Sequence, residues 1–135
     1  MLQKLNTKRG GFTLVEIMIV VAIIALLASI AVPNFLRSRK RSQATQILED
    51  IRQIDSAIDQ YAIENNKSLG NAVAWADVQK YIKTGTRLHA SGGKDILGAT
   101  LFSTGAVDTI PKIALSTYNA LSDVAPSDFW SPFNP

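Results

Sequence analysis

The first part of the chain carries one long apolar run. Residues 17–32 are hydrophobic at every position except Ser29, and as a helix this run alone spans roughly 24 Å at about 1.5 Å per residue. With the apolar side chains that flank it, the segment is long enough to cross a hydrocarbon layer about 30 Å thick. We therefore predict a membrane-spanning helix over residues 12–36, with Glu16 as the one charge inside it.

A second hydrophobic pattern, with a helical period, follows over residues 37–66. Apolar side chains recur every three or four residues from Ile47 to Tyr61, and acidic residues such as Asp50 are expected on the other faces. This spacing predicts an amphipathic continuation of the helix with one buried face. Since strong stop signals come only afterwards, we expect a single helix over residues 13–64, about 78 Å long.

Pro33 lies inside this predicted helix. Proline removes one backbone donor and clashes with the preceding turn. We therefore expect a kink or local melting of the helix near residues 29–33, with the Ser29 hydroxyl reaching back to a freed carbonyl.

The remaining residues, 67–135, lack long periodic segments and predict a small globular region. Its expected elements are a short helix over residues 72–83, strands over residues 95–102 and 106–115, and a short helix capped by Ser116 or Thr117 and ending at Leu121. About 70 residues are few for an independent core, so a small antiparallel sheet is expected to pack on the apolar face of the long helix. The predicted fold class is α+β, and the aromatic tail at Phe129, Trp130 and Phe133 is expected to tuck into this region.

Charge changes the picture mainly at the N-terminus. The chain of 135 residues holds 14 Lys and Arg against 11 Asp and Glu, a formal net charge of +3. The whole excess lies in residues 1–11, which contain Lys4, Lys8 and Arg9 and no acid. Because the rest of the chain is balanced, bulk charge gives no reason to expect a nucleic acid partner. The absence of cysteine excludes disulfides, thiolate zinc sites and cysteine nucleophiles.

A basic run follows the apolar segment directly, at Arg37, Arg39, Lys40 and Arg41. Its simplest interpretation is a solvated collar just outside a bilayer, but anionic lipid headgroups and DNA are alternative ligands. Residues 42–135 carry three more acids than bases, so the collar also suits lateral contacts between subunits.

The N-terminal pattern allows three interpretations. The first is a secretory signal peptide, with Ser29 and Ala31 at the small-residue cleavage positions and a soluble product that begins at Val32. The second is an uncleaved anchor of a bitopic membrane sensor or enzyme. The third depends on the polar residues before the apolar run, which read Lys8-Arg9-Gly10-Gly11 and then Phe12-Thr13-Leu14-Val15-Glu16.

This arrangement resembles the N-terminal signal of type IV pilins and type II secretion pseudopilins. The resemblance implies that a prepilin peptidase cuts after Gly11, on the cytoplasmic side, and methylates the new N-terminal residue, Phe12. A cut after Gly10 would misplace both Phe12 and Glu16 relative to the family pattern.

Glu16 requires a physical reason to lie in an apolar segment. A glutamate at mid-membrane costs about 2.5–3.5 kcal/mol even on permissive scales. The resemblance implies that its carboxylate pairs with the Phe12 amine of a neighbouring subunit in a filament, where each charge cancels the burial cost of the other. The alternative is a side chain that snorkels to the cytoplasmic interface.

The resemblance also implies the organisation of the whole chain. Residues 1–11 would be the leader, 12–36 the transmembrane and filament-core helix, 37–66 its amphipathic continuation and 67–135 the small globular head of a pilin-like fold. The protein would cross the bacterial inner membrane once, with a cytoplasmic leader and a periplasmic head, before it enters a periplasmic pseudopilus or an extracellular pilus.

The function implied is structural and not enzymatic. The lack of a C-terminal cysteine pair favours a subunit similar to the major pseudopilin of type II secretion, and a type IV pilus subunit for adhesion, motility or DNA uptake is the alternative. The implied partners are further copies in a homo-oligomeric filament, prepilin peptidase, an inner-membrane platform protein, an assembly ATPase, minor pseudopilins or pilins, and a secretin.

A metal site is a further expectation from the resemblance. Major pseudopilins bind calcium in a C-terminal loop, and the candidate ligands here are Asp95, Asp123 and Asp128. The turn Asp95-Ile96-Leu97-Gly98 resembles the D-x-x-G-N-P turn of that family, with Ala99 and Thr100 in place of Asn-Pro. Ordinary turn and capping aspartates are the alternative interpretation.

Overall fold

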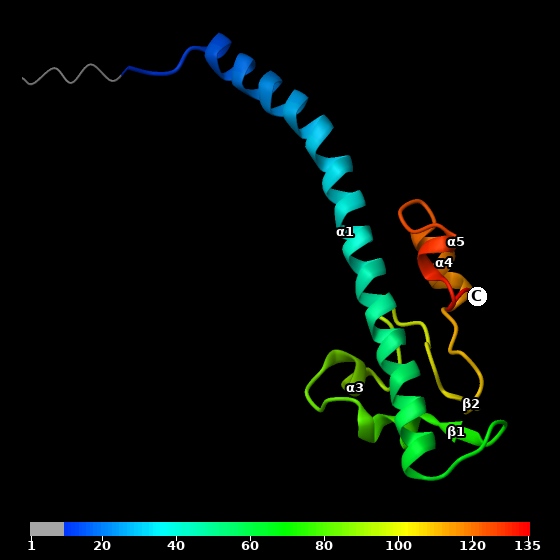
Figure 1. The fold of residues 1–135 in the computed structure, drawn as a ribbon. Helices are drawn as coiled ribbons and strands as arrows, with labels where there is room; N and C mark the ends of the chain where they lie inside the picture. The colour runs from blue at the N-terminus through cyan, green and yellow to red at the C-terminus, as the bar shows by residue number, and fades with distance from the viewer. Residues whose placement is uncertain (1–9) are drawn as a thin grey trace, which may run out of the picture. The chain divides into compact units, whose positions relative to one another are not determined.

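The computed structural model describes residues 10–135, and these form parts of two compact units. The first unit is Met1–Leu36 and the second, here called the globular unit, is Arg37–Pro135. One helix, α1 (Leu14–Glu64), runs through residues of both units (Figure 1). The single long helix predicted from the hydrophobic pattern is therefore confirmed.

The first unit consists of the apolar part of α1 and the short segment before it. All of its described residues, 10–36, are exposed, and Phe12 and Leu26 are exposed by 85% and 64%. This part of α1 is long and apolar enough to cross a membrane by length and composition. Its side chains thus find no apolar cover within the described part of their own unit.

Pro33 does not interrupt α1, so the expected local melting near residues 29–33 is absent. The Ser29 hydroxyl does reach back, but it donates to the Leu26 carbonyl at 2.7 Å. The carbonyl that loses its helical donor to proline is four residues before Pro33, on Ser29 itself. The expected repair of the freed carbonyl is therefore wrong, whereas a kink remains a prediction.

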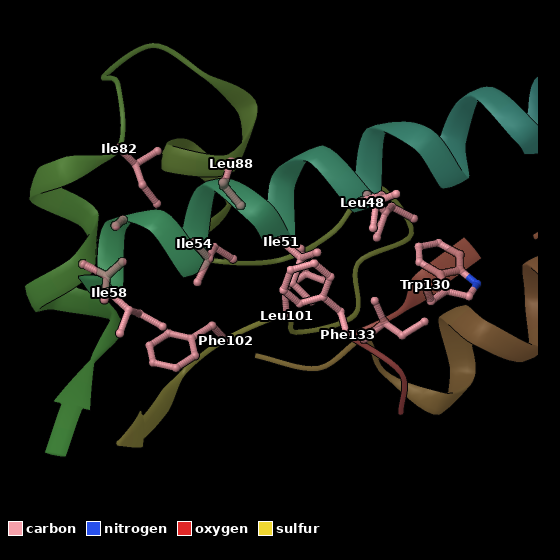
Figure 2. Packing of buried hydrophobic residues seen from close by; sticks show 14 of the residues in the cluster. Leu48, Ile51, Ile54, Ile58, Ile82, Leu88, Leu101, Phe102, Trp130 and Phe133 are labelled. Carbon is pink, nitrogen blue, oxygen red and sulfur yellow. The ribbon is translucent and has the colours of Figure 1, made fainter. Parts of the chain in front are cut away.

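The globular unit is built around one apolar face of α1. Seven apolar residues of α1 are buried there, each one or three positions after the previous one, with the helical period that the sequence pattern predicts: Ala44, Ile47, Leu48, Ile51, Ile54, Ala57 and Ile58. Segments from the rest of the unit cover this stripe, with Phe102 toward its Ile58 end and Trp130 and Phe133 toward its Leu48 end (Figure 2).

The other elements of the globular unit are short. Strands β1 (Ala72–Ala74) and β2 (Thr104–Ala106) pair antiparallel, with Val73 opposite Gly105. The helical elements are α2 (Trp75–Val78), the 3-10 turn η1 (Gln79–Tyr81), α3 (Arg87–Ser91), α4 (Leu115–Leu121) and α5 (Ser127–Trp130). A long helix packed with a small antiparallel sheet and short helices confirms the α+β, pilin-like fold class.

The strand positions expected from the sequence are wrong. Residues 95–102 form no strand, and the observed strand β2 overlaps the expected strand 106–115 only at Ala106. Residues 95–102 instead begin with a turn, because the Asp95 carboxylate accepts hydrogen bonds from the Leu97 and Ala99 amides. The helix expected over 72–83 likewise starts with strand β1.

The C-terminal part of the unit confirms one expectation and corrects another. The Trp130 indole is fully buried and donates to the Ala125 carbonyl at 3.1 Å, so the aromatic tail does tuck into the core. Helix α4 forms where a helix was expected, but its N-cap is Ala114 and no side chain caps it. Thr117, one of the expected caps, is buried inside the helix and donates to Asp95 instead.

Candidate functional site

The residues expected to direct processing lie just before α1. Gly10 and Gly11 are exposed, and a Cβ atom at either position would meet no other atom within 4 Å. The chain's own packing therefore does not require glycine at these positions. Lys8 and Arg9, the basic residues of the motif, lie outside the described residues.

Thr13 and Glu16 form a reciprocal capping box at the start of α1. The Thr13 amide donates to Glu16 Oε2 at 2.7 Å, and the Glu16 amide donates to Thr13 Oγ1 at 3.2 Å. The Thr13 hydroxyl also donates to Glu16 Oε2, at 2.9 Å. These bonds satisfy amides that a helix leaves open at its N-terminus. The spacing Thr-x-x-Glu was visible in the sequence, but its capping role was not recognised there.

The capping box fixes the Glu16 carboxylate at the positive end of the helix dipole. Both hydrogen bonds that the Glu16 carboxylate accepts are to Oε2, so within the described residues Oε1 stays open to a further donor. The site can therefore hold its acid by local bonds and still accept one more cationic or hydrogen-bonding partner.

The basic run after residue 36 divides into two parts. Lys40 donates to both carboxylate oxygens of Asp123, at 3.1 and 3.0 Å, which pairs the collar with the loop after α4. Arg37 and Arg41 are exposed and line a hollow of about 400 Å³ with Ser38, Asp123 and Val124. We call this the basic hollow.

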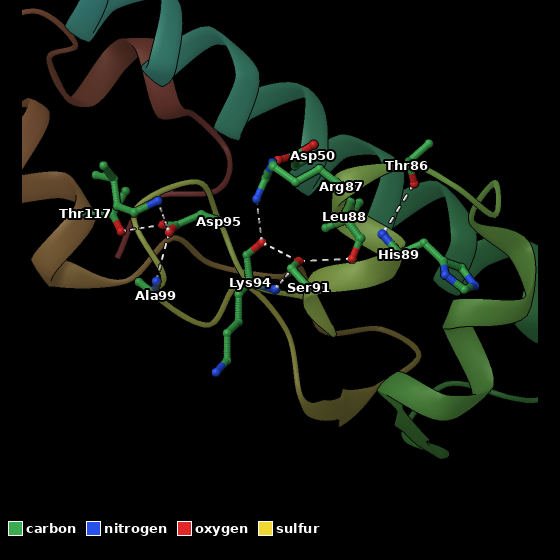
Figure 3. Close-up of polar contacts among 11 residues, drawn as sticks. Asp50, Thr86, Arg87, Leu88, His89, Ser91, Lys94, Asp95, Ala99 and Thr117 are labelled. Carbon is green, nitrogen blue, oxygen red and sulfur yellow. Dashed lines mark hydrogen bonds and ion pairs between the residues drawn. The ribbon is translucent and has the colours of Figure 1, made fainter.

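The three aspartates considered as calcium ligands have separate surroundings. Asp95 is buried, and its carboxylate accepts from the amides of Leu97 at 2.9 Å and Ala99 at 2.8 Å and from the Thr117 hydroxyl at 2.5 Å (Figure 3). Asp123 pairs with Lys40.

Asp128 is exposed at the start of α5 and accepts from the Ser127 hydroxyl at 3.4 Å. Over residues 10–135, no three or more His, Cys, Asp or Glu side chains gather into a group that could hold a metal ion. The structure thus does not bring the three candidates together. Since the three carboxylates do not gather into one group, this set does not fit the converging oxygens that calcium needs.

A partly buried ion pair, Asp50 with Arg87, was not found from the sequence, and the expectation that Asp50 lies away from the buried face of α1 is wrong. Asp50 is only 8% exposed, and the Arg87 guanidinium donates to its carboxylate and, at 3.2 Å, to the Lys94 carbonyl (Figure 3). Burial raises the pKa of Asp50 above its ordinary value, although the charge of Arg87 acts in the opposite direction. Position 50 follows Ile47 by three residues and precedes Ile54 by four, so its place on the buried face was readable from the spacing.

These features define a class before any comparison: a protein with a capped apolar N-terminal helix that is long enough to cross a membrane and a small globular unit. Residues 6–32 match the family described as the prokaryotic N-terminal methylation motif. The chain is 32% identical over 121 residues to the type IV major pilin protein PilE1 of Neisseria gonorrhoeae, a match that covers 84% of this chain and 70% of that pilin.

Proteins of type II secretion also match. The chain is 38% identical over 60 residues to the type II secretion system core protein G of Pectobacterium carotovorum, and 39% identical over 59 residues to that of Escherichia coli K12. Each match covers 44% of this chain, and the matched parts span 38% and 41% of those relatives. No solved structure matches the chain.

The chain therefore belongs to the family of type IV pilins and type II secretion pseudopilins, as its N-terminal motif indicates. The matched relatives are named as pilin and secretion-system proteins, and none of these three as an enzyme.

Proposed function

We propose that this protein is a filament subunit that prepilin peptidase cuts after Gly11 and methylates on Phe12. The observation that carries the proposal is the exposure of residues 12–36. They contain the apolar first part of α1, and all of them are exposed. Such a surface needs cover from outside its unit, first from lipid and then from the same helix of neighbouring copies. Glycines that the fold does not require, at positions 10 and 11, agree with recognition by a second protein.

The open oxygen of Glu16 supports a specific assembly contact. Cleavage after Gly11 creates an amine on Phe12, and Oε1 of Glu16 is open to a cation from a neighbouring copy. Pairing of the two would remove two isolated charges from the apolar interior of the filament. We therefore assign Glu16 to assembly and Phe12 to both processing and pairing.

N-terminal mass spectrometry of the membrane-extracted protein tests the processing step. We expect N-methylated phenylalanine at position 12, whereas an intact Met1 or a start at Val32 would overturn the proposal. Gly11→Leu should block maturation, and the matched variant Gly10→Leu should still be cut. The reverse pattern would place the cut after Gly10.

Within the family, we propose a subunit of a type II secretion pseudopilus. The sequence has no cysteine for the C-terminal pair of many type IV pilins, and its relatives include core protein G of several secretion systems. In this role the filament would grow in the periplasm with an assembly ATPase, a platform protein, minor pseudopilins and a secretin.

A type IV pilus subunit is the second candidate, because one observation favours it. The similarity to the Neisseria pilin extends over 121 residues, about twice the length of the secretion matches. Deletion of the gene in its host distinguishes the two roles. Loss of secreted enzymes with intact surface pili supports the pseudopilus, and loss of surface pili with normal secretion supports the pilus.

A further inference from the structure

We propose that the basic hollow binds the phosphate of an anionic phospholipid while the subunit resides in the membrane. Arg37 and Arg41 are four residues apart on α1, so they lie on one face of the helix. Ser38 lies between them in sequence and lines the same hollow of about 400 Å³. Two guanidinium groups and a hydroxyl around one concave surface match the several oxygens of a phosphate diester.

The charges around the hollow favour an anion. Asp123 is the one acid in its lining, and Lys40 holds both oxygens of that carboxylate at about 3 Å. The Asp123 charge is thereby compensated by a residue outside the lining. Arg37 and Arg41 form no ion pair among the described residues, which leaves their charges to a ligand.

The position in the chain favours lipid over other anions. Arg37 directly follows Leu36, the last apolar residue of the segment long enough to cross a membrane. Basic residues immediately beyond a membrane span lie at headgroup depth, where each contributes to the binding of anionic lipid. The proposal rests on membrane anchoring and does not depend on filament assembly.

Lipid selectivity of the full chain in nanodiscs tests the site, with one chain per disc so that no second copy takes part. The sequence has no cysteine, so Ser42→Cys, at an exposed position next to the hollow, carries one fluorescent label. The measured quantity is quenching by brominated phosphatidylglycerol relative to brominated phosphatidylcholine. We expect a preference for phosphatidylglycerol that Arg41→Gln lowers about fivefold.

Arg39→Gln is the matched control, because Arg39 has the same charge in the same turn but does not line the hollow. It should lower the preference by less than half as much as Arg41→Gln. Asp123→Asn should raise the preference, since it removes the acid of the lining and frees Lys40. If Arg39→Gln and Arg41→Gln lower the preference for phosphatidylglycerol equally, the attraction is diffuse and the proposed site is wrong.

Competition experiments distinguish a phospholipid from inorganic phosphate and DNA as the ligand of the basic hollow. Phosphatidylglycerol preference that survives millimolar inorganic phosphate and excess duplex DNA supports a lipid site, whereas loss to either competitor overturns it. A chain that fails to co-elute with nanodiscs would overturn anchoring and the lipid site together. Co-elution with no lipid preference would overturn the lipid site alone.

Discussion

The two halves of α1, residues 14–36 and 37–64, place the same residue types in opposite surroundings. Ile24 in the first half is 59% exposed, whereas Ile51 in the second half is fully buried. The second half is covered by the chain's own strands, loops and aromatic tail. The first half has only exposed side chains, so nothing in the described part of its own unit covers this apolar surface. One continuous helix thus has an apolar half that is fully exposed and a half that forms the core of the globular unit.

The largest effect is expected from Glu16→Ala, which should reduce filament assembly without changing the stability of the globular unit. Because Glu16 belongs to the exposed half, the variant should insert into the membrane and keep the unfolding temperature of the globular unit. Filament yield, measured from sheared surface or overexpressed filaments, should fall at least tenfold. Without Glu16, the Phe12 amine of the neighbouring copy would be buried without its counter-charge, at a cost of about 2.5–3.5 kcal/mol. Glu49→Ala, at an exposed site of the second half, is the control. Normal filaments from Glu16→Ala would exclude the pairing.

The pair Ile51→Ala and Ile24→Ala compares the halves with one chemical change. Removal of a buried isoleucine should lower the free energy of unfolding of the globular unit by about 2–5 kcal/mol. Ile24→Ala should leave it unchanged, because that side chain belongs to the other unit and is 59% exposed. Urea unfolding followed by the fluorescence of buried Trp130 measures both variants. Equal losses would show that the halves do not fold separately.

The ion pair of Asp50 and Arg87 joins the start of α3 to the buried half of α1, and Arg87→Met should break it. A buried carboxylate without its partner costs about 3 kcal/mol. Because burial raises the pKa of Asp50, stability linked to this group is present below its ordinary value of 3.8 and is lost as pH rises through the folded pKa. The loss in Arg87→Met should therefore be larger at pH 7 than at pH 4.

Urea midpoints at the two pH values measure this difference. The control is Arg52→Met, which breaks an exposed pair with Glu49 and should cost less than about 1 kcal/mol. An equal loss at both pH values would attribute the cost of Arg87→Met to packing and not to charge.

Asp95→Ala tests the turn that anchors residues 95–99 to α4. The variant leaves two amides and the Thr117 hydroxyl without their acceptor, which should cost about 2 kcal/mol in urea unfolding. Asp128→Ala, at an exposed position, should cost much less. Since protein donors already engage Asp95, addition of calcium or EDTA should not shift the Tm of the wild type. A calcium-dependent Tm that Asp95→Ala abolishes would contradict this account.

The helix could be predicted from the sequence because its signals are local. Apolar positions three and four residues apart lie on one face whatever the rest of the chain does, and the buried stripe from Ala44 to Ile58 follows that rule. The motif at Gly11, Phe12 and Glu16 is equally local, which is why the family could be identified before the fold.

The strands and the ion pair depend on contacts between distant residues. Asp50 and Arg87 are 37 positions apart, and no spacing rule predicts such a partner. Gly93 illustrates the same limit for the sheet region. Its φ is +80°, and a Cβ there would lie 2.7 Å from the Phe102 carbonyl oxygen and from the Trp75 ring. This close approach requires glycine at position 93, and neither local spacing nor strand propensity predicts it.

The smallest effect on stability is expected from Asp55→Asn, a substitution within the buried half of α1. Asp55 is partly buried on α1, and burial together with the charge of Asp59 raises its pKa above the ordinary value of 3.8. At pH 7 the ionised form is therefore disfavoured in the folded state, so Asp55→Asn should stabilise the globular unit by about 0.5 kcal/mol or less. The gain should vanish near pH 3, where the acid is protonated in both states. Urea midpoints at pH 7 and pH 3 measure it, with exposed Asp128→Asn as the control. A destabilised Asp55→Asn at pH 7 would show that the carboxylate makes a favourable contact that outweighs its burial.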